Sequence, residues 1–119
     1  MCLLDRVLDY DASTIRCSAS SHRRADNPLR NDAQLGIAAG IEYAAQAMAL
    51  HGGLLADSSQ PPRQGYLASV RSVRFHALRL DEQPADLLVE AERLSGDANQ
   101  VLYRFAVSAA GQPLLAHQL

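Results

Sequence analysis

The segment GIEYAAQAMALHGG, residues Gly40–Gly53, decides the fold because it reads as a long helix with almost no polar face. Alanine, leucine, methionine and glutamine favour helix, so we expect one from Gly36 to Leu50. The pair Gly52-Gly53 is expected to end it. Because small apolar side chains occupy nearly every face, the helix is expected to be buried on most sides. Glu42 is the one acid in this segment, and its carboxylate must be solvated, paired or used in chemistry.

The rest of the chain shows the two-residue period of β-strands. Before the helix, two extended pieces around a turn at residues 9–13 lead into a polar, proline-bearing loop, SSHRRADNPLRND (Ser20–Asp32). After the helix, apolar alternation begins at Tyr66, and a change of parity near Arg71 and Ser72 indicates a β-bulge. Further alternating segments, joined by the turns SGDANQ and AAGQP, cover residues 87–92, 101–108 and 114–119.

These elements predict a single α+β domain over residues 1–119. An antiparallel sheet of five to six strands must cover the apolar helix, since nothing else in the chain can bury it. The sheet is therefore expected to wrap around one long central helix. The last alternating segment stops in mid-pattern at Leu119, so the native chain is expected to continue beyond that residue.

Composition narrows the function classes. The net charge of −2 argues against nucleic acid or an anionic membrane as partner. The opening residues, MCLLDRVLD, contain charged side chains at Asp5 and Arg6. The apolar stretch before them is too short for a signal peptide or a membrane span. Cys2 and Cys17 lack CxxC spacing and a His/Cys cluster, so no metal is expected and both are read as free thiols. We therefore expect a cytoplasmic protein.

The order of the elements is that of the hotdog fold, and the residues resemble one branch of it, the 3-hydroxyacyl-[acyl-carrier-protein] dehydratases. LLDRV (Leu3–Val7) is similar to the start of those enzymes. GIEYAAQAMA resembles their central helix, whose signature is a Glu followed four residues later by Gln, here Glu42 and Gln46. GYLASVRSVRF (Gly65–Phe75) and LLAHQL resemble later strands. The polar loop and the helix together look most like the ApeP-like dehydratase subunits of aryl polyene synthesis.

The resemblance implies loss of water from a 3-hydroxyacyl chain that is carried on the phosphopantetheine of acyl carrier protein, with no other cofactor. A base removes the proton next to the thioester carbonyl, and an acid protonates the leaving hydroxyl. In the family the acid is a Glu or Asp on the helix, which is Glu42 here. An apolar setting would raise the pKa of this carboxyl, as a proton donor requires. The alternative is a first-turn Glu that complements the helix dipole.

Three further helix residues are expected to bind the substrate. Gly36 and Gly40 allow a close approach to the start of the helix, where free N–H groups can stabilise an enolate-like oxygen. Gln46 lies one turn after Glu42 on the same face and is expected to orient it. A polar group satisfied at a dimer seam is an equal alternative for Gln46.

The base departs from the family pattern. Family members carry the catalytic His fourteen residues before the Glu, in an HFPG-type motif, whereas Pro28 holds that position here. The nearest upstream histidine is His22, twenty residues before Glu42. Either the loop takes a different course and delivers His22 as the base, or His22 is a surface residue at a strand end. Asn27, in the same loop, is assigned to substrate binding.

The remaining candidates have plainer interpretations. His51 is expected to be a C-terminal helix residue that is favoured by the dipole. Arg23, Arg24 and Arg30 could meet the phosphopantetheine or the acidic carrier protein, although a solvated loop explains them as well.

Three functions remain open. The first is dehydration of carrier-bound 3-hydroxyacyl thioesters to 2-enoyl thioesters. The second is a catalytically incomplete hotdog subunit that pairs with a related dehydratase and stabilises it, since the family works as homodimers or heterodimers in which the His of one subunit faces the acid of the other. The third is an acyl thioesterase, with a helix carboxylate as base for water. The length and type of the acyl chain are not predicted.

Overall fold

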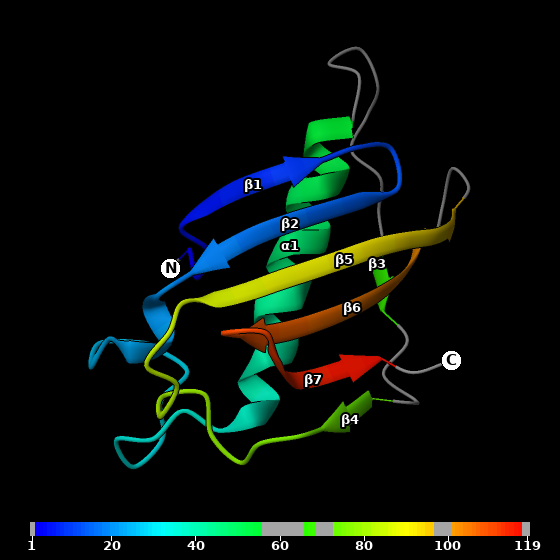
Figure 1. Ribbon diagram of the computed structural model, residues 1–119. Coiled ribbons are helices and arrows are strands. Elements are labelled where there is room, and N and C mark those ends of the chain that lie inside the picture. The colour runs from blue at the N-terminus through cyan, green and yellow to red at the C-terminus, as the bar shows by residue number, and fades with distance from the viewer. Residues whose placement is uncertain (1, 56–65, 69–72, 97–100, 118–119) are drawn as a thin grey trace.

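A computed structural model describes residues 2–55, 66–68, 73–96 and 101–117 of the chain (Figure 1). It contains one long helix, two 3-10 turns and seven strands. In chain order these are β1 (Arg6–Tyr10), β2 (Thr14–Ala19), η1 (Ser21–Arg23), η2 (Ile37–Ala39), α1 (Gly40–Leu55), β3 (Tyr66–Ala68), β4 (Val73–Phe75), β5 (Leu87–Gly96), β6 (Val101–Ala109) and β7 (Gln112–His117).

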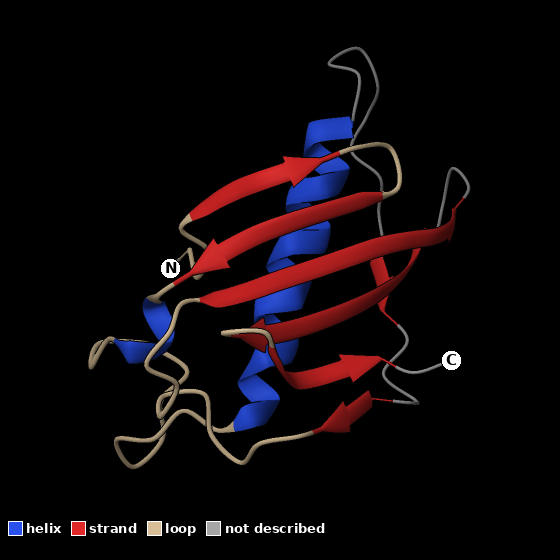
Figure 2. Ribbon diagram, viewed as in Figure 1, coloured by secondary structure: helices blue, strands red, loops and turns tan. Residues whose placement is uncertain are grey.

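Six strands form one antiparallel sheet in the order β1-β2-β5-β6-β7-β4, which crosses the long axis of α1 (Figure 2). This arrangement confirms the predicted α+β hotdog fold. The expected bulged strand after the helix is instead two short strands. β3 pairs in parallel with residues 101–103 of β6, and β4 pairs with β7. The predicted bulge at Arg71 and Ser72 lies outside the described residues.

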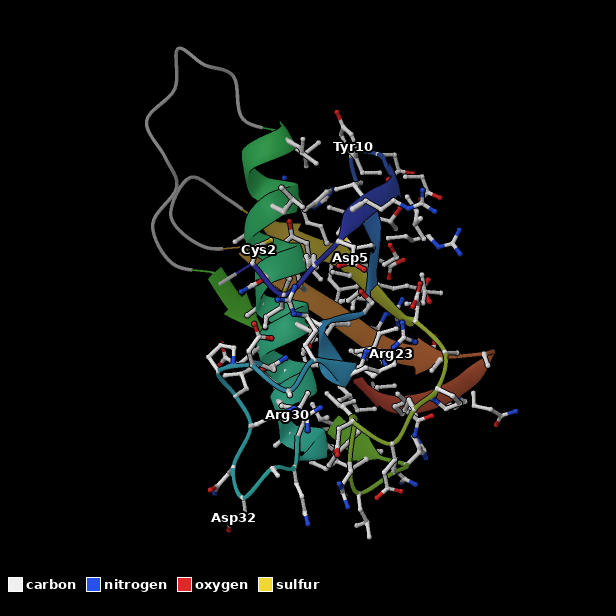
Figure 3. The ribbon with its side chains drawn as sticks, turned by 90° about the vertical axis from the view of Figure 1, so that its left-hand side faces the viewer. Cys2, Asp5, Tyr10, Arg23, Arg30 and Asp32 are labelled. Carbon is white, nitrogen blue, oxygen red and sulfur yellow. The ribbon has the colours of Figure 1, made fainter. Side chains whose placement is uncertain are left out.

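The helix packs on the sheet through a single face, and Figure 3 shows the two layers side by side. Its buried positions recur three and four residues apart, which is the period of one helical stripe. They are Gly40, Tyr43, Ala44, Ala47, Met48 and His51. The inner face of the sheet meets them with buried side chains that include Ile15, Cys17, Val89, Phe105 and Val107. Each large side chain buried in this way stabilises the fold by about 1.5–3 kcal/mol.

Two expectations for the helix are wrong. It begins at Gly40, after the 3-10 turn η2, and it runs through Gly52-Gly53 to Leu55. The only positive-φ glycine in the described ranges is Gly111, so neither Gly52 nor Gly53 takes the left-handed conformation that ends a helix. A glycine inside a helix lowers stability by about 1 kcal/mol relative to alanine. The buried residues of the preceding turn, Met48 and His51, offset this loss.

The helix is also not buried on most sides. The sheet covers one stripe only, and Glu42, Ala45, Ala49 and Leu50 on other faces are exposed. Small apolar residues all around the helix hid this asymmetry in the sequence. The single chain therefore presents an uncovered helix face that is mostly apolar and carries one carboxylate. No helix in the described ranges is long and apolar enough to span a membrane.

His51 fastens the last turns of the helix to the sheet and is fully buried, contrary to the expected dipole-favoured end position. Its Nε2 lies 2.7 Å from the carbonyl oxygen of Asp11, so Nε2 carries the hydrogen and donates it. Nδ1 lies 2.6 Å from the hydroxyl of Tyr103, which donates to it when the ring is neutral. The Asp11 carboxylate in turn accepts the backbone N–H groups of Ser13 and Thr14 and holds the β1–β2 turn.

Tyr103→Phe is expected to destabilise the protein by about 1–3 kcal/mol, because it removes the hydroxyl that satisfies the buried Nδ1 of His51 while keeping the ring. Urea unfolding followed by circular dichroism measures this loss. Tyr10→Phe is the matched control, since Tyr10 is 48% exposed, and it should change stability by less than about 0.5 kcal/mol. Equal stability of the two variants would contradict the role of His51.

Candidate active site

The loop between β2 and the helix folds against the segment before β5. The N–H of Ile37 donates to the Leu78 carbonyl at 3.0 Å, and the N–H of Leu80 donates to the Leu35 carbonyl at 2.8 Å. Asp81 strengthens this junction by accepting the N–H of Leu35 at 3.1 Å and two hydrogen bonds from the Arg79 guanidinium. The hydrogen bonds from Arg79 hold the pKa of Asp81 at about 2, below its usual 3.8. The loop is thus fixed beside the start of α1.

His22 lies in η1 and is fully buried, so the surface alternative for it is wrong. Its Nε2 lies 3.0 Å from the Gln83 carbonyl oxygen, and since a carbonyl only accepts, Nε2 carries the hydrogen. Nδ1 has no hydrogen-bond partner among the described residues. Burial lowers the pKa of His22 below its ordinary 6.5. A neutral imidazole with a free basic nitrogen is the form that a general base requires.

A buried network of hydroxyl and amide groups lies next to His22. Ser21 donates from Oγ to the Leu3 carbonyl at 2.8 Å, so the Tyr43 hydroxyl donates to Ser21 Oγ, at 2.7 Å. Asn27 donates from Nδ2 to the Ser21 carbonyl at 2.9 Å and to the Tyr43 hydroxyl at 3.1 Å. Its Oδ1 accepts the N–H of Leu29. Asn27 thus joins the loop to the helix, and its assignment to substrate binding stays a prediction.

Glu42 lies in the first turn of α1 and its side chain is exposed. In the part of the chain that the structure describes, it makes no hydrogen bond or ion pair, and none joins it to His22. The apolar setting expected for this acid is therefore not supplied by the described residues of its own chain. His22 faces the segment before β5, whereas Glu42 lies outside the buried stripe of the helix.

Of the other three predicted substrate-binding residues, Gln46 and Gly40 have contacts that position the helix. Gln46 accepts the N–H of Leu3 through Oε1 at 2.7 Å and so ties the N-terminal segment to α1. A Cβ at Gly40 would collide with Cδ2 of Leu115, so this glycine lets the helix approach β7 closely. Gly36 has open space where a Cβ would lie. Their roles toward a substrate stay predictions.

The loop arginines all have partners within the chain, which accounts for them without a ligand. Arg23 donates to the Pro84 carbonyl and pairs with Asp86, both at 2.6 Å. Arg24 pairs with Asp26 on the surface at 2.9 Å. Figure 3 places Arg30 beside the beginning of α1, and its side chain is only 16% exposed. The predicted contact of these arginines with a carrier protein stays a prediction.

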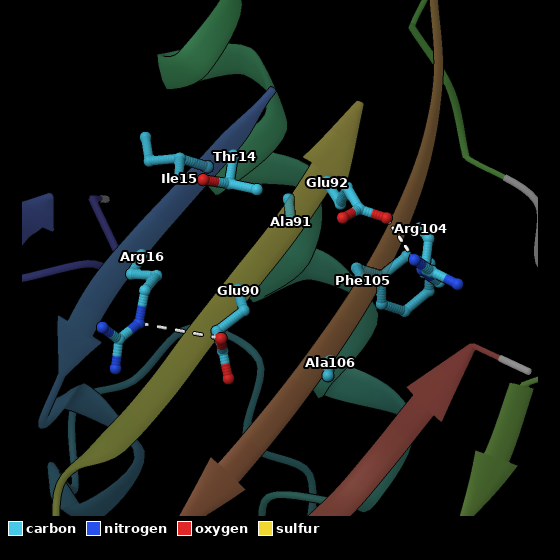
Figure 4. A pocket seen from close by; sticks show the side chains of 9 residues that line it. All are labelled: Thr14, Ile15, Arg16, Glu90, Ala91, Glu92, Arg104, Phe105 and Ala106. Carbon is cyan, nitrogen blue, oxygen red and sulfur yellow. Dashed lines mark hydrogen bonds and ion pairs between the residues drawn. The ribbon is translucent and has the colours of Figure 1, made fainter. Parts of the chain in front are cut away.

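A shallow hollow of about 280 Å³ lies on the outer face of the sheet, away from His22 and Glu42 (Figure 4). Two cross-strand ion pairs flank it, Arg16 with Glu90 and Arg104 with Glu92. These four charged side chains are each more than a third exposed, and ion pairs of this kind contribute little to the stability of the fold. The hollow contains none of the predicted site residues. Within the described ranges, no three His, Cys, Asp or Glu side chains gather in a way that would hold a metal ion.

Sequence patterns did not single out several residues that build this region. The ring of His22 is held by a backbone carbonyl, that of Gln83, and a carbonyl carries no sequence signal. Tyr43 could have been found from its place in the helix, since a phenol on a buried stripe needs a hydrogen-bond partner. Nothing in the sequence pattern marked Asp81 as a structural residue. One of its partners, Leu35, is distant along the chain, and the other, Arg79, lies only two residues before it.

The family model described as ApeP-like, ApeP dehydratase, matches residues 1–119. Among solved structures, the chain is similar to a chain of "The Dehydratase Heterocomplex ApeI:P from Xenorhabdus doucetiae". The identity is 20%, the TM-score is 0.72, and the match covers 98% of this chain and 83% of that one. At this identity the match supports the fold. No curated protein matches the chain.

Asp81→Asn is expected to cost about 2 kcal/mol of stability at pH 7, because the folded pKa of Asp81, about 2, lies below the unfolded value of 3.8. A carboxylate with a depressed pKa stabilises the fold fully above pH 3.8, and this contribution is lost as the pH falls through about 2. The difference between wild type and variant should therefore shrink in that window, as measured by urea unfolding at a series of pH values. Glu82→Gln, at a mostly exposed acid, is the control. A difference that does not change with pH would refute the assignment.

Proposed function

The chain belongs to the ApeP-like dehydratase family, and we propose that it dehydrates 3-hydroxyacyl thioesters on acyl carrier protein to 2-enoyl thioesters, as one subunit of a shared site. The observation that carries this proposal is His22, a buried imidazole whose Nε2 lies on the Gln83 carbonyl and whose Nδ1 meets the geometric criteria for a hydrogen bond with none of the described residues. A basic nitrogen without a hydrogen bond in a buried place is rare unless it is used.

In the proposed reaction, Nδ1 of His22 removes the proton from the carbon next to the thioester carbonyl. The electrons of that C–H bond form the new double bond, and the bond from the neighbouring carbon to the hydroxyl oxygen breaks. Glu42, protonated, gives its proton to the leaving oxygen, which departs as water. The imidazolium that forms keeps its Nε2–H on the Gln83 carbonyl, so the ring does not turn between steps.

The two groups are proposed to come from different subunits: His22 and Glu42 meet where two copies of this chain pair, and in a pair with a related subunit each faces the corresponding group of that partner. Glu42 is exposed and His22 is buried, and no polar contact joins them within the described part of one chain. A second hotdog subunit seated on the uncovered face of α1 would remove Glu42 from water, and desolvation raises the pKa of a carboxyl. Access to Nδ1 requires that the packing over His22 opens when the subunits or the substrate bind. The solved heterocomplex, a dehydratase of two kinds of subunit by its title, supports a related partner.

The same separation of Glu42 from His22 favours a second candidate, a subunit that completes or stabilises a related dehydratase without catalysing turnover itself. No particular contact favours a thioesterase. The product distinguishes that reading, because a thioesterase releases the free acid and a dehydratase releases water from an intact thioester.

Glu42→Gln is expected to lower turnover by about 10²–10⁴, because it keeps the shape of the side chain and removes only the transferable proton. The measurement is loss of water from a 3-hydroxyacyl-carrier-protein substrate, followed by mass spectrometry. The chain is assayed alone and together with a related hotdog dehydratase subunit. Glu90→Gln, which neutralises an exposed acid on the outer sheet face, is the matched control.

His22→Gln in the same assay is expected to be as inactive as Glu42→Gln. Full turnover by Glu42→Gln would remove the proposed acid. If the wild-type complex is active while both variants keep its rate, the chain is a stabilising subunit and the active site belongs to its partner. Release of free acid would replace dehydration by thioester hydrolysis.

A further inference from the structure

Arg30 donates hydrogen bonds to three backbone carbonyls of its own loop. Its Nε donates to the Arg24 carbonyl at 2.7 Å, Nη1 to the Ala33 carbonyl at 2.9 Å, and Nη2 to the His22 carbonyl at 3.1 Å. Nη1 also lies 3.9 Å from a carboxylate oxygen of Asp81, whose side chain is 8% exposed. The planar fork of an arginine reaches three acceptors at once, which the ammonium of a lysine cannot do with the same geometry.

These contacts hold His22 from two sides. The Arg30 guanidinium binds the carbonyl of His22 itself. It also faces Asp81, which lies two residues before Gln83, and the Gln83 carbonyl holds the imidazole ring. The backbone of His22 and the acceptor of its ring are thus both connected to one side chain. Loss of that side chain would remove the hydrogen bond to the His22 carbonyl and the charge opposite Asp81, which keeps its bonds to Arg79 and Leu35.

The turn after Arg30 depends on the same contact. Asp32 and Ala33 have φ values of 54° and 61°, the left-handed region that non-glycine residues adopt at a cost of about 1–2 kcal/mol each. Figure 3 shows Asp32 at the outer tip of the loop. The turn directs the Ala33 carbonyl to Nη1 of Arg30, so the hydrogen bond offsets part of the cost.

We propose that Arg30 is a positioning residue for His22, clamping the loop so that Nε2 of the imidazole stays on the Gln83 carbonyl and Nδ1 is left for the substrate once the packing over it opens. This inference deepens the proposed function and rests on it for the catalytic consequence. This role differs from the sequence-based interpretation of Arg30 as a contact of phosphopantetheine. Three of the five N–H groups of the Arg30 guanidinium already donate to backbone carbonyls, which leaves only two for a phosphate.

The test is a pH titration of the histidine side chains by long-range ¹H–¹⁵N NMR in wild type, Arg30→Gln and Arg24→Gln, with His22 assigned from the spectrum of His22→Gln. Arg24→Gln is the matched control, since it removes a charge from the same loop at a side chain that contacts Asp26 and not His22. Arg23 and Asp86, the charged groups that act on the pKa of His22, are unchanged in both variants.

In wild type and in Arg24→Gln, the signals of His22 should show hydrogen on Nε2, with titration below pH 6.5. In Arg30→Gln, His22 should show both tautomers and titrate closer to 6.5, because the ring leaves its buried place. In the active complex, kcat should fall about tenfold or more, with KM within about twofold, because a misplaced base affects chemistry more than binding. Arg30→Lys should restore part of the wild-type behaviour.

Unchanged tautomer and titration of His22 in a folded Arg30→Gln would overturn the proposal. If Arg30→Gln does not fold, Arg30→Lys serves as the test. It keeps the positive charge opposite Asp81, and its His22 should still show part of the change in tautomer and titration. The NMR result does not depend on activity. A wild-type complex without turnover would count against dehydration, whereas a His22 unchanged from wild type in the Arg30 variants would count against positioning.

Discussion

The burial of one stripe of α1 on the inner face of the sheet is the contact on which the rest of the structure depends. It places Tyr43 and His51 under the sheet, where each must find hydrogen-bond partners. Tyr43 finds them in the loop that carries His22, and His51 finds them in the β1–β2 turn and in β6. Hydrogen bonds thus fasten the helix near both ends, and its opposite face is left uncovered.

The contrast between the buried and the uncovered face of α1 explains why the candidate site residues lie apart in one subunit. One subunit offers a neutral, buried imidazole with a free nitrogen and, elsewhere, an exposed carboxylate. Nδ1 of His22, the proposed base, becomes accessible only when the packing over it opens, and Glu42, the proposed acid, is exposed to water in the single chain. In the proposed complex, a second subunit on the uncovered helix face covers this carboxylate. In the proposed function, Arg30 and Asp81 keep His22 in place while that surface stays open for a partner.

The fold was predictable from the sequence, but the state of the site residues was not. The two-residue period of the strands and the apolar helix are local signals, and they predicted an antiparallel sheet of five to six strands around one helix, close to the observed order. The burial of His22 and His51 depends on the carbonyls of Gln83 and Asp11, which any residue type can present. The exposure of Glu42 was hidden because alanines occupy both the buried and the uncovered faces of the helix.

The central claim is that a second hotdog subunit covers Glu42. Carbodiimide labelling of carboxylates, quantified by mass spectrometry, tests it with Glu90 on the outer sheet face as internal reference. In the chain alone, both carboxylates should react, because both are solvent-accessible. In the complex with a related dehydratase subunit, Glu42 should be protected while Glu90 reacts as before. Equal labelling of Glu42 in the two samples would contradict the account.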